Sequence, residues 1–220
     1  MNPWELLPLR APFVLGEDRA AVIAFNQKAV DRIRLHLELL PEPYVGSLTA
    51  PVIVLTLNPG YNAADRAVHQ RASFRALVRA CHVQQPAPYP NYYLNPSVTG
   101  GGAAWWARIT APLIREFGVE AVSRNVASLE YVPYHSELFA HATLRLPSQS
   151  YTLSVVSVAM ARGAVIFIAR GHKLWEAALP GLSTYHHAYT TRSAQNVTIS
   201  PKNAPLGYRA AQTQIRIAAV

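Results

Sequence analysis

The stretch from Pro51 to Asn62, PVIVLTLNPGYN, constrains the fold more than any other part of the sequence. Apolar and β-branched residues run without a break through 52–57, which is typical of a strand buried on both faces of a parallel sheet. The run ends at Asn58-Pro59-Gly60, where proline fixes φ and glycine lets a ligand approach the backbone closely. Open α/β sheets bind ligands at the carboxyl ends of their strands, so this turn is a candidate site. An ordinary strand-to-loop exit is the alternative reading.

Segments of helical and strand character alternate along the chain. Strands are expected at 52–57, 126–132, 164–169, near 185–189 and at 196–199, and helices at 17–40, 64–80, 103–118, 150–162, 172–179 and 206–218. This alternation predicts a three-layer α/β/α sandwich with a central, mostly parallel sheet of four or five strands. We expect one domain over residues 1–220, with 1–50 as a helical extension packed on it.

Composition limits the classes of function. The 20 Lys and Arg residues against 12 Asp and Glu give a net charge of +8, which favours a polyanionic partner. The single Cys81 excludes an intramolecular disulfide and any multi-cysteine metal or iron–sulfur site. The histidines follow no HExxH or comparable spacing, so neither a metal nor another cofactor is expected. No apolar run reaches the length of a membrane span and no export signal stands at the N-terminus, which predicts a cytoplasmic protein.

Polar motifs follow several of the expected strands. Besides Asn58-Pro59-Gly60 they are the segments at 130–136, 170–172 and 200–203. The carboxyl ends of parallel strands lie on one edge of a sheet, so these motifs are expected to converge on one pocket.

The order and character of these segments resemble the uracil-DNA glycosylase superfamily. Its first motif, in the mismatch-specific and single-strand-selective branches, is a strand followed by Asn-Pro-Gly, as in LTLNPG here. Its second is a strand followed by His-Pro-Ser or a related tripeptide and a DNA-intercalating loop, for which TISPKNAPLG is the candidate. Between them, SLEYVPYHS takes the place of the strand whose end supplies a base-reading side chain. The resemblance covers most of the chain from about Pro51 onward, and a bacterial group of that fold shares its combination of motifs.

The resemblance implies roles for individual residues. Asn58 would position the attacking water, Gly60 would leave room beside the extruded base, and Glu130 falls where the family reads the base edge. An ionised carboxylate only accepts hydrogen bonds, which favours a base edge that presents donors over that of uracil. The family's leaving-group histidine has no match, because Ile199 precedes Ser200-Pro201, and losing such a donor typically costs about 10²–10³-fold in rate.

The sequence thus predicts a glycosylase-like protein that acts on a nucleic-acid base or a nucleotide, with DNA preferred over RNA. A catalytically inactive nucleic-acid-binding or interaction module of the same fold is the alternative. Glu130 and His135 form a candidate acid/base pair, a loop-ordering role for His135 being the alternative. A Ser136 hydrolase is a rival that lacks a GxSxG elbow. The candidate catalytic residues are Asn58, Glu130 and His135; the candidate substrate-binding residues are Pro59, Gly60, Tyr61, Tyr134, Ser136 and Ser200; and the candidate nucleic-acid contacts are Lys202, Asn203, Leu206 and Arg209.

Overall fold

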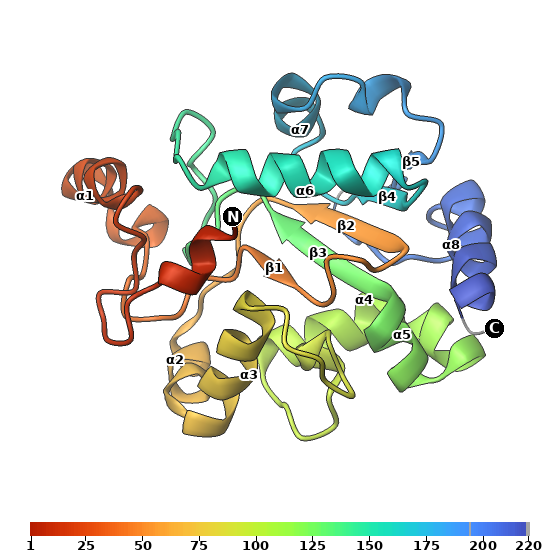
Figure 1. The fold of residues 1–220 in the computed structure, drawn as a ribbon, viewed down its shortest axis with the longest axis horizontal. Coiled ribbons are helices and arrows are strands. Elements are labelled where there is room, and N and C mark those ends of the chain that lie inside the picture. Colours follow the sequence, from red (N-terminus) through yellow and green to blue (C-terminus); the bar gives the residue numbers. More distant parts are fainter. Residues whose placement is uncertain (194, 219–220) are drawn as a thin grey trace.

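The central sheet has five strands in the order β1-β3-β2-β4-β5 (Figure 1). The computed structural model describes residues 1–193 and 195–218. Strand β2 (Val52–Thr56) lies in the middle, parallel to β3 (Val126–Glu130) and to β4 (Val165–Ile168), and β4 is parallel to β5 (Ala188–Thr190). The short edge strand β1 (Tyr44–Val45) runs antiparallel to β3. An α/β fold with a five-stranded, mostly parallel sheet is therefore confirmed.

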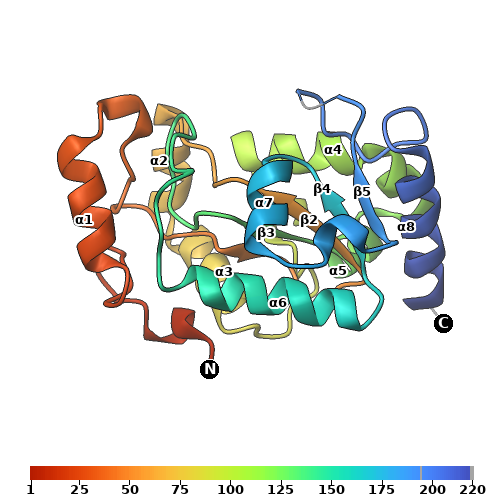
Figure 2. The same ribbon diagram turned by 90° about the horizontal axis from the view of Figure 1, so that it is seen from above.

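Eight α-helices surround this sheet in the described part of the chain. They are α1 (Arg19–Lys28), α2 (Ala63–Gln70), α3 (Ala72–His82), α4 (Gly101–Phe117), α5 (Val119–Asn125), α6 (Gln149–Ala161), α7 (His172–Ala178) and α8 (Pro205–Ala218). Figures 1 and 2 show α6 and α7 on one face of the sheet and α3, α4 and α5 on the other. The structure is an α/β sandwich, in which every residue of β2, β3 and β4 is buried.

The N-terminal segment departs from the expected single long helix over 17–40. Helix α1 ends at Lys28, and Asn26 then binds both the backbone N–H and the carbonyl of Leu35 across a loop. Val30, in the middle of the expected helix, is 67% exposed, whereas Leu35 is buried. Residues 1–50 are also more than a helical extension packed on the domain, because they contain β1, which is a strand of the central sheet.

Two further expectations are corrected. The helix expected at 64–80 is two helices, separated by the extended backbone of Arg71. The strand expected at 196–199 is not formed. There the backbone N–H of Ile199 donates to the carbonyl of Ile109 on α4 instead of to a strand.

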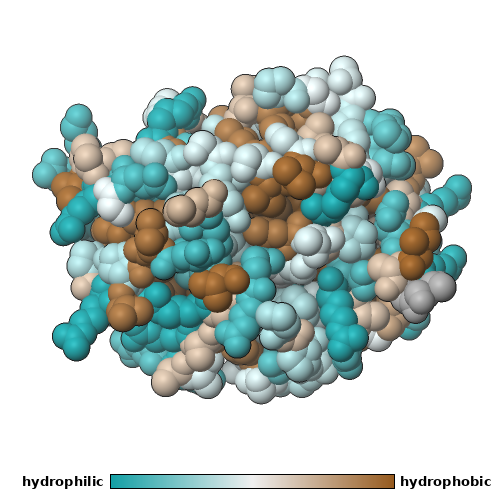
Figure 3. All heavy atoms as spheres, in the orientation of Figure 1, coloured by the Kyte–Doolittle hydropathy of each residue, from teal (hydrophilic) through white to brown (hydrophobic). Residues whose placement is uncertain are grey.

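The surface is a mixture of apolar and polar side chains. Figure 3 shows hydrophilic residues interspersed with apolar ones on the face that carries α6, where Val158 is 62% exposed. Among the described residues, no helix combines the length and the apolar character that crossing a membrane requires.

Candidate active site

Asn58 stands two residues beyond the end of β2 and is held by the loop that follows β3. Its Nδ2 donates to the carbonyl of Pro59 (3.0 Å) and to Oγ of Ser136 (2.8 Å), and Ser136 Oγ donates in turn to the carbonyl of Leu138 (2.9 Å). Both amide protons are thus used within the fold. No hydrogen bond to Asn58 Oδ1 is found within the described residues, and the side chain is only partly buried. The oxygen therefore remains an acceptor for a bound molecule.

The turn after Asn58 is tied to the same loop and opens toward solvent. Gly60 pairs with Ser136 as an isolated parallel bridge, which continues the β2–β3 pairing beyond the strands. Pro59 is buried and Gly60 is exposed. A Cβ added to Gly60 would meet no atom within 4 Å, so there is open space beside this residue. The ring of Tyr61 stacks on that of His36, with centroids 3.6 Å apart.

Glu130 ends β3 directly beside Thr56 of β2. Asn58 follows Thr56 by two residues, so Asn58 and Glu130 both lie at the carboxyl ends of neighbouring parallel strands. The Glu130 side chain is buried and its Oε2 has no hydrogen-bond partner in the described structure. Burial, with a further contribution from the Glu42 carboxyl, raises the pKa of Glu130 to about 8. At neutral pH this carboxyl is therefore mostly protonated and can both donate and accept a hydrogen bond.

His135 makes no hydrogen bond to Glu130 in the described structure. It faces the carboxylate of Glu42, which the sequence analysis did not identify. Its Nδ1 is 2.8 Å from the carbonyl of Gly60, and its Nε2 is 3.1 Å from the carbonyl of Leu40 and 3.9 Å from Oε1 of Glu42. Both ring nitrogens are thus occupied by protein groups, which argues against the predicted Glu130–His135 acid/base pair. The alternative, a histidine that orders its loop, agrees with this geometry.

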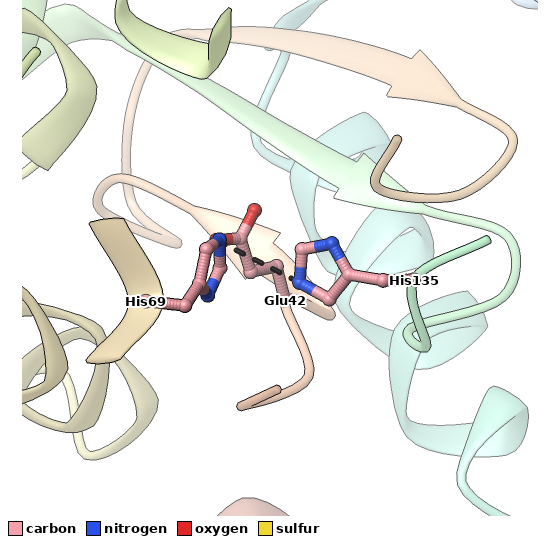
Figure 4. Close-up of side chains that lie close together, drawn as sticks. All are labelled: Glu42, His69 and His135. Atoms are coloured by element: carbon pink, nitrogen blue, oxygen red, sulfur yellow. Dashed lines mark ion pairs between the residues drawn. The ribbon is translucent and has the colours of Figure 1, made fainter. Parts of the chain in front are cut away.

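Glu42 and His69 complete a buried group with His135 (Figure 4). Nε2 of His69 lies 3.8 Å from Oε1 of Glu42, and burial together with the neighbouring His135 lowers the pKa of His69 to about 3. Burial raises the pKa of Glu42. The three residues are far apart in sequence and follow no motif, so only the fold brings them together.

Two predicted substrate-binding residues serve the fold. Tyr134 is buried, and its hydroxyl donates to Oδ2 of Asp18 (2.8 Å) and accepts from the backbone N–H of Leu15 (3.2 Å). Its side chain therefore anchors the N-terminal segment. Ser136 is also buried, and it orients Asn58.

The Ser200 loop stands apart from Asn58 in its hydrogen bonding. Oγ of Ser200 accepts from the N–H of Asn203 within its own turn, and no hydrogen bond links Ser200 to Asn58 or Glu130 in the described structure. Asn203 binds Asn196, Thr198 and Ser193 through its side chain, so this side chain orders the loop. Ile199 is buried in the core.

The remaining predicted nucleic-acid contacts are on the surface. Lys202, Leu206 and Arg209 are all exposed, Leu206 by 67%. Leu206, at the start of α8, therefore does not pack in the core.

Two cavities lie elsewhere on the molecule. One cavity of about 330 Å³ has Gly46, Cys81, Tyr89 and Arg124 among its lining residues. Another, of about 230 Å³, lies between Tyr131, Arg145 and Trp175. Neither is lined by Asn58, Glu130 or Ser200, so the single cleft expected for these three residues does not coincide with either cavity.

Comparisons with protein-family models, with curated proteins and with solved structures found no match for this chain.

Proposed function

We propose that this protein excises or binds a base of nucleic acid in the manner of the uracil-DNA glycosylases that carry Asn-Pro-Gly. The hydrogen bonding of Asn58 carries the proposal. With both amide protons fixed by Pro59 and Ser136, Asn58 presents only its oxygen, which is the group needed to hold a water molecule by one of its protons. The open space beside Gly60 fits a base or sugar placed next to that water.

The proposed reaction is hydrolysis of an N-glycosidic bond. Water bound to Asn58 Oδ1 attacks the sugar carbon, the bond from that carbon to the base nitrogen breaks, and its electron pair leaves with the base. The base thereby gains negative charge. The proton that the water loses passes to solvent or to the departing base, because the Asn58 amide orients the water and does not take up its proton. A protonated Glu130 would donate a hydrogen bond to the departing base, in place of the histidine whose position is taken by the buried Ile199.

Glu130 also changes the expected base. A neutral carboxyl has one donor and one acceptor, the same pattern as the amide that reads the base in the family. The objection to uracil, which assumed an ionised carboxylate, does not apply to a group whose pKa is raised to about 8. We therefore include uracil among the proposed substrates.

The alternative is a nucleic-acid-binding module without chemistry. Ile199 favours it, because an apolar side chain that is buried in the core cannot stabilise the negative charge of a leaving base. Binding through exposed Lys202 and Arg209 should weaken steeply with added salt in either case.

The decisive experiment measures base release from a panel of oligonucleotides with uracil or other modified bases. Asn58→Ala should lower the rate of release by at least about 10²-fold, because the water loses its acceptor, while nucleic-acid affinity stays the same. Asn95→Ala is the control, since Asn95 bonds only within its own turn at Ser97.

If the unchanged protein binds the oligonucleotides but releases no base from any of them, the glycosylase proposal is wrong and the binding module remains. Equal rates for the unchanged protein and Asn58→Ala would exclude the role given to Asn58.

A further inference from the structure

Three side chains with metal-binding atoms meet beneath the Asn58-Pro59-Gly60 turn. Glu42 comes from the segment before β1, His69 from the last turn of α2 and His135 from the loop after β3. Figure 4 shows the carboxylate between the two imidazole rings. One oxygen or nitrogen atom from each residue lies within 4.8 Å of the other two, and all three residues are buried. We call this group the Glu42–His69–His135 cluster.

The separations within the cluster are too long for direct hydrogen bonds. Oε1 of Glu42 is 3.8 Å from Nε2 of His69 and 3.9 Å from Nε2 of His135, whereas hydrogen bonds of this kind are about 2.7–3.2 Å long. Two ligand atoms bound to one tetrahedral zinc ion at about 2.1 Å each lie about 3.4 Å apart. Movements of a few tenths of an ångström would bring both pairs to that spacing.

Groups around the cluster orient two of the three residues as the partners of metal ligands usually do. The hydroxyl of Tyr93 donates to Oε1 of Glu42 (2.7 Å), and the carbonyl of Gly60 accepts from Nδ1 of His135 (2.8 Å). A histidine that donates one ring N–H to a backbone carbonyl presents the other nitrogen to a metal. The Tyr93 contact favours an ionised Glu42, and the Gly60 contact favours a proton on Nδ1 of His135. Nε2 of His135 also lies 3.1 Å from the carbonyl of Leu40, so metal binding requires this nitrogen to exchange that contact for the ion.

An arrangement without a metal explains less of the cluster. A protonated His135 could pair with Glu42 and donate to the carbonyls of Gly60 and Leu40. It would leave Nε2 of His69 3.8 Å from Oε1 of Glu42, which is too far for a hydrogen bond. A metal ion bound between these atoms would engage Nε2 of His69, whereas Nδ1 of the same ring has no hydrogen-bond partner in either arrangement.

We propose that Glu42, His69 and His135 bind one divalent transition-metal ion, with zinc the best match to the ligand types and their spacing. Two imidazoles and one carboxylate form a known zinc ligand set, and three protein ligands leave the fourth position to water or another small ligand. The ion joins the segment before β1, α2 and the loop after β3, and so fixes the floor of the turn that carries Asn58. The proposal does not depend on base excision, because its test measures metal alone.

The first experiment uses the full chain prepared without a polyhistidine tag. After dialysis, elemental analysis should find about one zinc ion per chain. After removal of zinc by a chelator, added Co²⁺ should bind with the same stoichiometry and give the visible absorption of a tetrahedral site, and added Zn²⁺ should displace it and raise the melting temperature. Folded protein that retains no metal and binds neither Zn²⁺ nor Co²⁺ would overturn the proposal and leave the His135–Glu42 pair.

Variants locate the ion. Glu42→Gln and His69→Gln should lose the bound metal. His141→Gln, which alters another buried histidine, and His186→Gln, which alters the neighbouring pair His186 and His187 with ring centroids 4.0 Å apart, should keep it. Metal retained in Glu42→Gln and His69→Gln, or lost only in His186→Gln, would overturn the proposal.

Tyr93→Phe keeps the test valid if the ligand variants do not fold. It preserves all three ligands and removes only the hydroxyl that orients Glu42, so metal affinity should fall about 10–100-fold. Tyr185→Phe is the control, because the hydroxyl of Tyr185 bonds to the distant carbonyl of Ala164. Equal metal affinities for the two tyrosine variants would contradict the proposal that Glu42, oriented by the Tyr93 hydroxyl, is a metal ligand.

Discussion

The turn at Asn58 and the loop at Ser200 both carry glycosylase-like motifs, yet their side chains are used differently. At Asn58, polar groups from two segments, 58–60 and 135–136, are bonded to one another, through the Asn58 amide and Ser136 and through the Gly60 carbonyl and His135. In the Ser200 loop, Ser200 and Asn203 bond only to nearby loop residues, and Lys202, Leu206 and Arg209 extend into solvent. The first region is built to hold a small group in a fixed position. The second offers cationic and apolar side chains to a large partner.

The largest expected effect concerns Glu130 in the buried region. Burial raises the pKa of the folded carboxyl to about 8, whereas the unfolded one loses its proton near the ordinary glutamate pKa of about 4.5. The folded state therefore holds more protons between these values, and this group lowers the free energy of unfolding as pH rises through that window. Glu130→Gln stays neutral, so it should stabilise the protein relative to the unchanged chain by up to about 3 kcal/mol at pH 7 and by little at pH 4.5.

Denaturant unfolding at several pH values measures this difference. Glu17→Gln, which changes an exposed carboxylate, should show no comparable trend. A stability difference for Glu130→Gln that does not grow between pH 4.5 and 8 would mean that Glu130 is ionised in the folded protein. The argument for uracil, which requires a neutral Glu130 carboxyl, would then fail. The buried region would carry a charge, as the exposed region does.

An intermediate effect is expected at Leu206 in the exposed region. Leu206→Ala should leave the unfolding free energy unchanged within about 0.5 kcal/mol, because the side chain is 67% exposed. If Leu206 wedges into nucleic acid, affinity for a duplex should fall about tenfold. Ile217→Ala on the same helix is the matched control, since Ile217 is 63% exposed. Equal duplex affinities of Leu206→Ala and Ile217→Ala, measured by fluorescence anisotropy, would exclude insertion of Leu206 into nucleic acid. Only the cationic side chains of this region would then remain as contacts.

The smallest effect on the fold is expected at Gly60. A methyl group there meets no atom within 4 Å, so Gly60→Ala should change the unfolding free energy by less than about 0.5 kcal/mol. It should nevertheless slow base release several-fold by filling the space proposed for the base. Gly16→Ala, where a Cβ also meets nothing, controls for the substitution itself. Unchanged base release in Gly60→Ala would place the base elsewhere.

The sequence predicted the sheet well because its central strands are continuous apolar runs, and those runs form β2, β3 and β4. It predicted the position of Asn58 at a strand end for the same reason. It failed for the helix at 17–40, where apolar spacing matched a helix although Asn26 and Leu35 bond across a loop. It also failed for the strand at 196–199, because Ile199 found its backbone partner on a helix.

The site was only partly predictable for a different reason. Strand ends are local features, and Glu130 and Asn58 could be placed from them. The Glu42–His69–His135 cluster depends on where a pre-strand segment, a helix end and a loop meet, which no spacing within the sequence records. Likewise, the use of Tyr134 as a partner for Asp18 depends on the path of the N-terminal segment.

The central position of β2 also affects how the protein folds during synthesis. β2 is the first of the long strands to leave the ribosome, and its partners begin only at Val126 and Val165. Until those residues emerge, the sequence VIVLT has two unpaired edges and no charge, a combination that promotes aggregation of incomplete chains. Formation of the sheet is therefore a late event that depends on contacts between distant residues, and expression yield should be sensitive to the rate of translation downstream of β2.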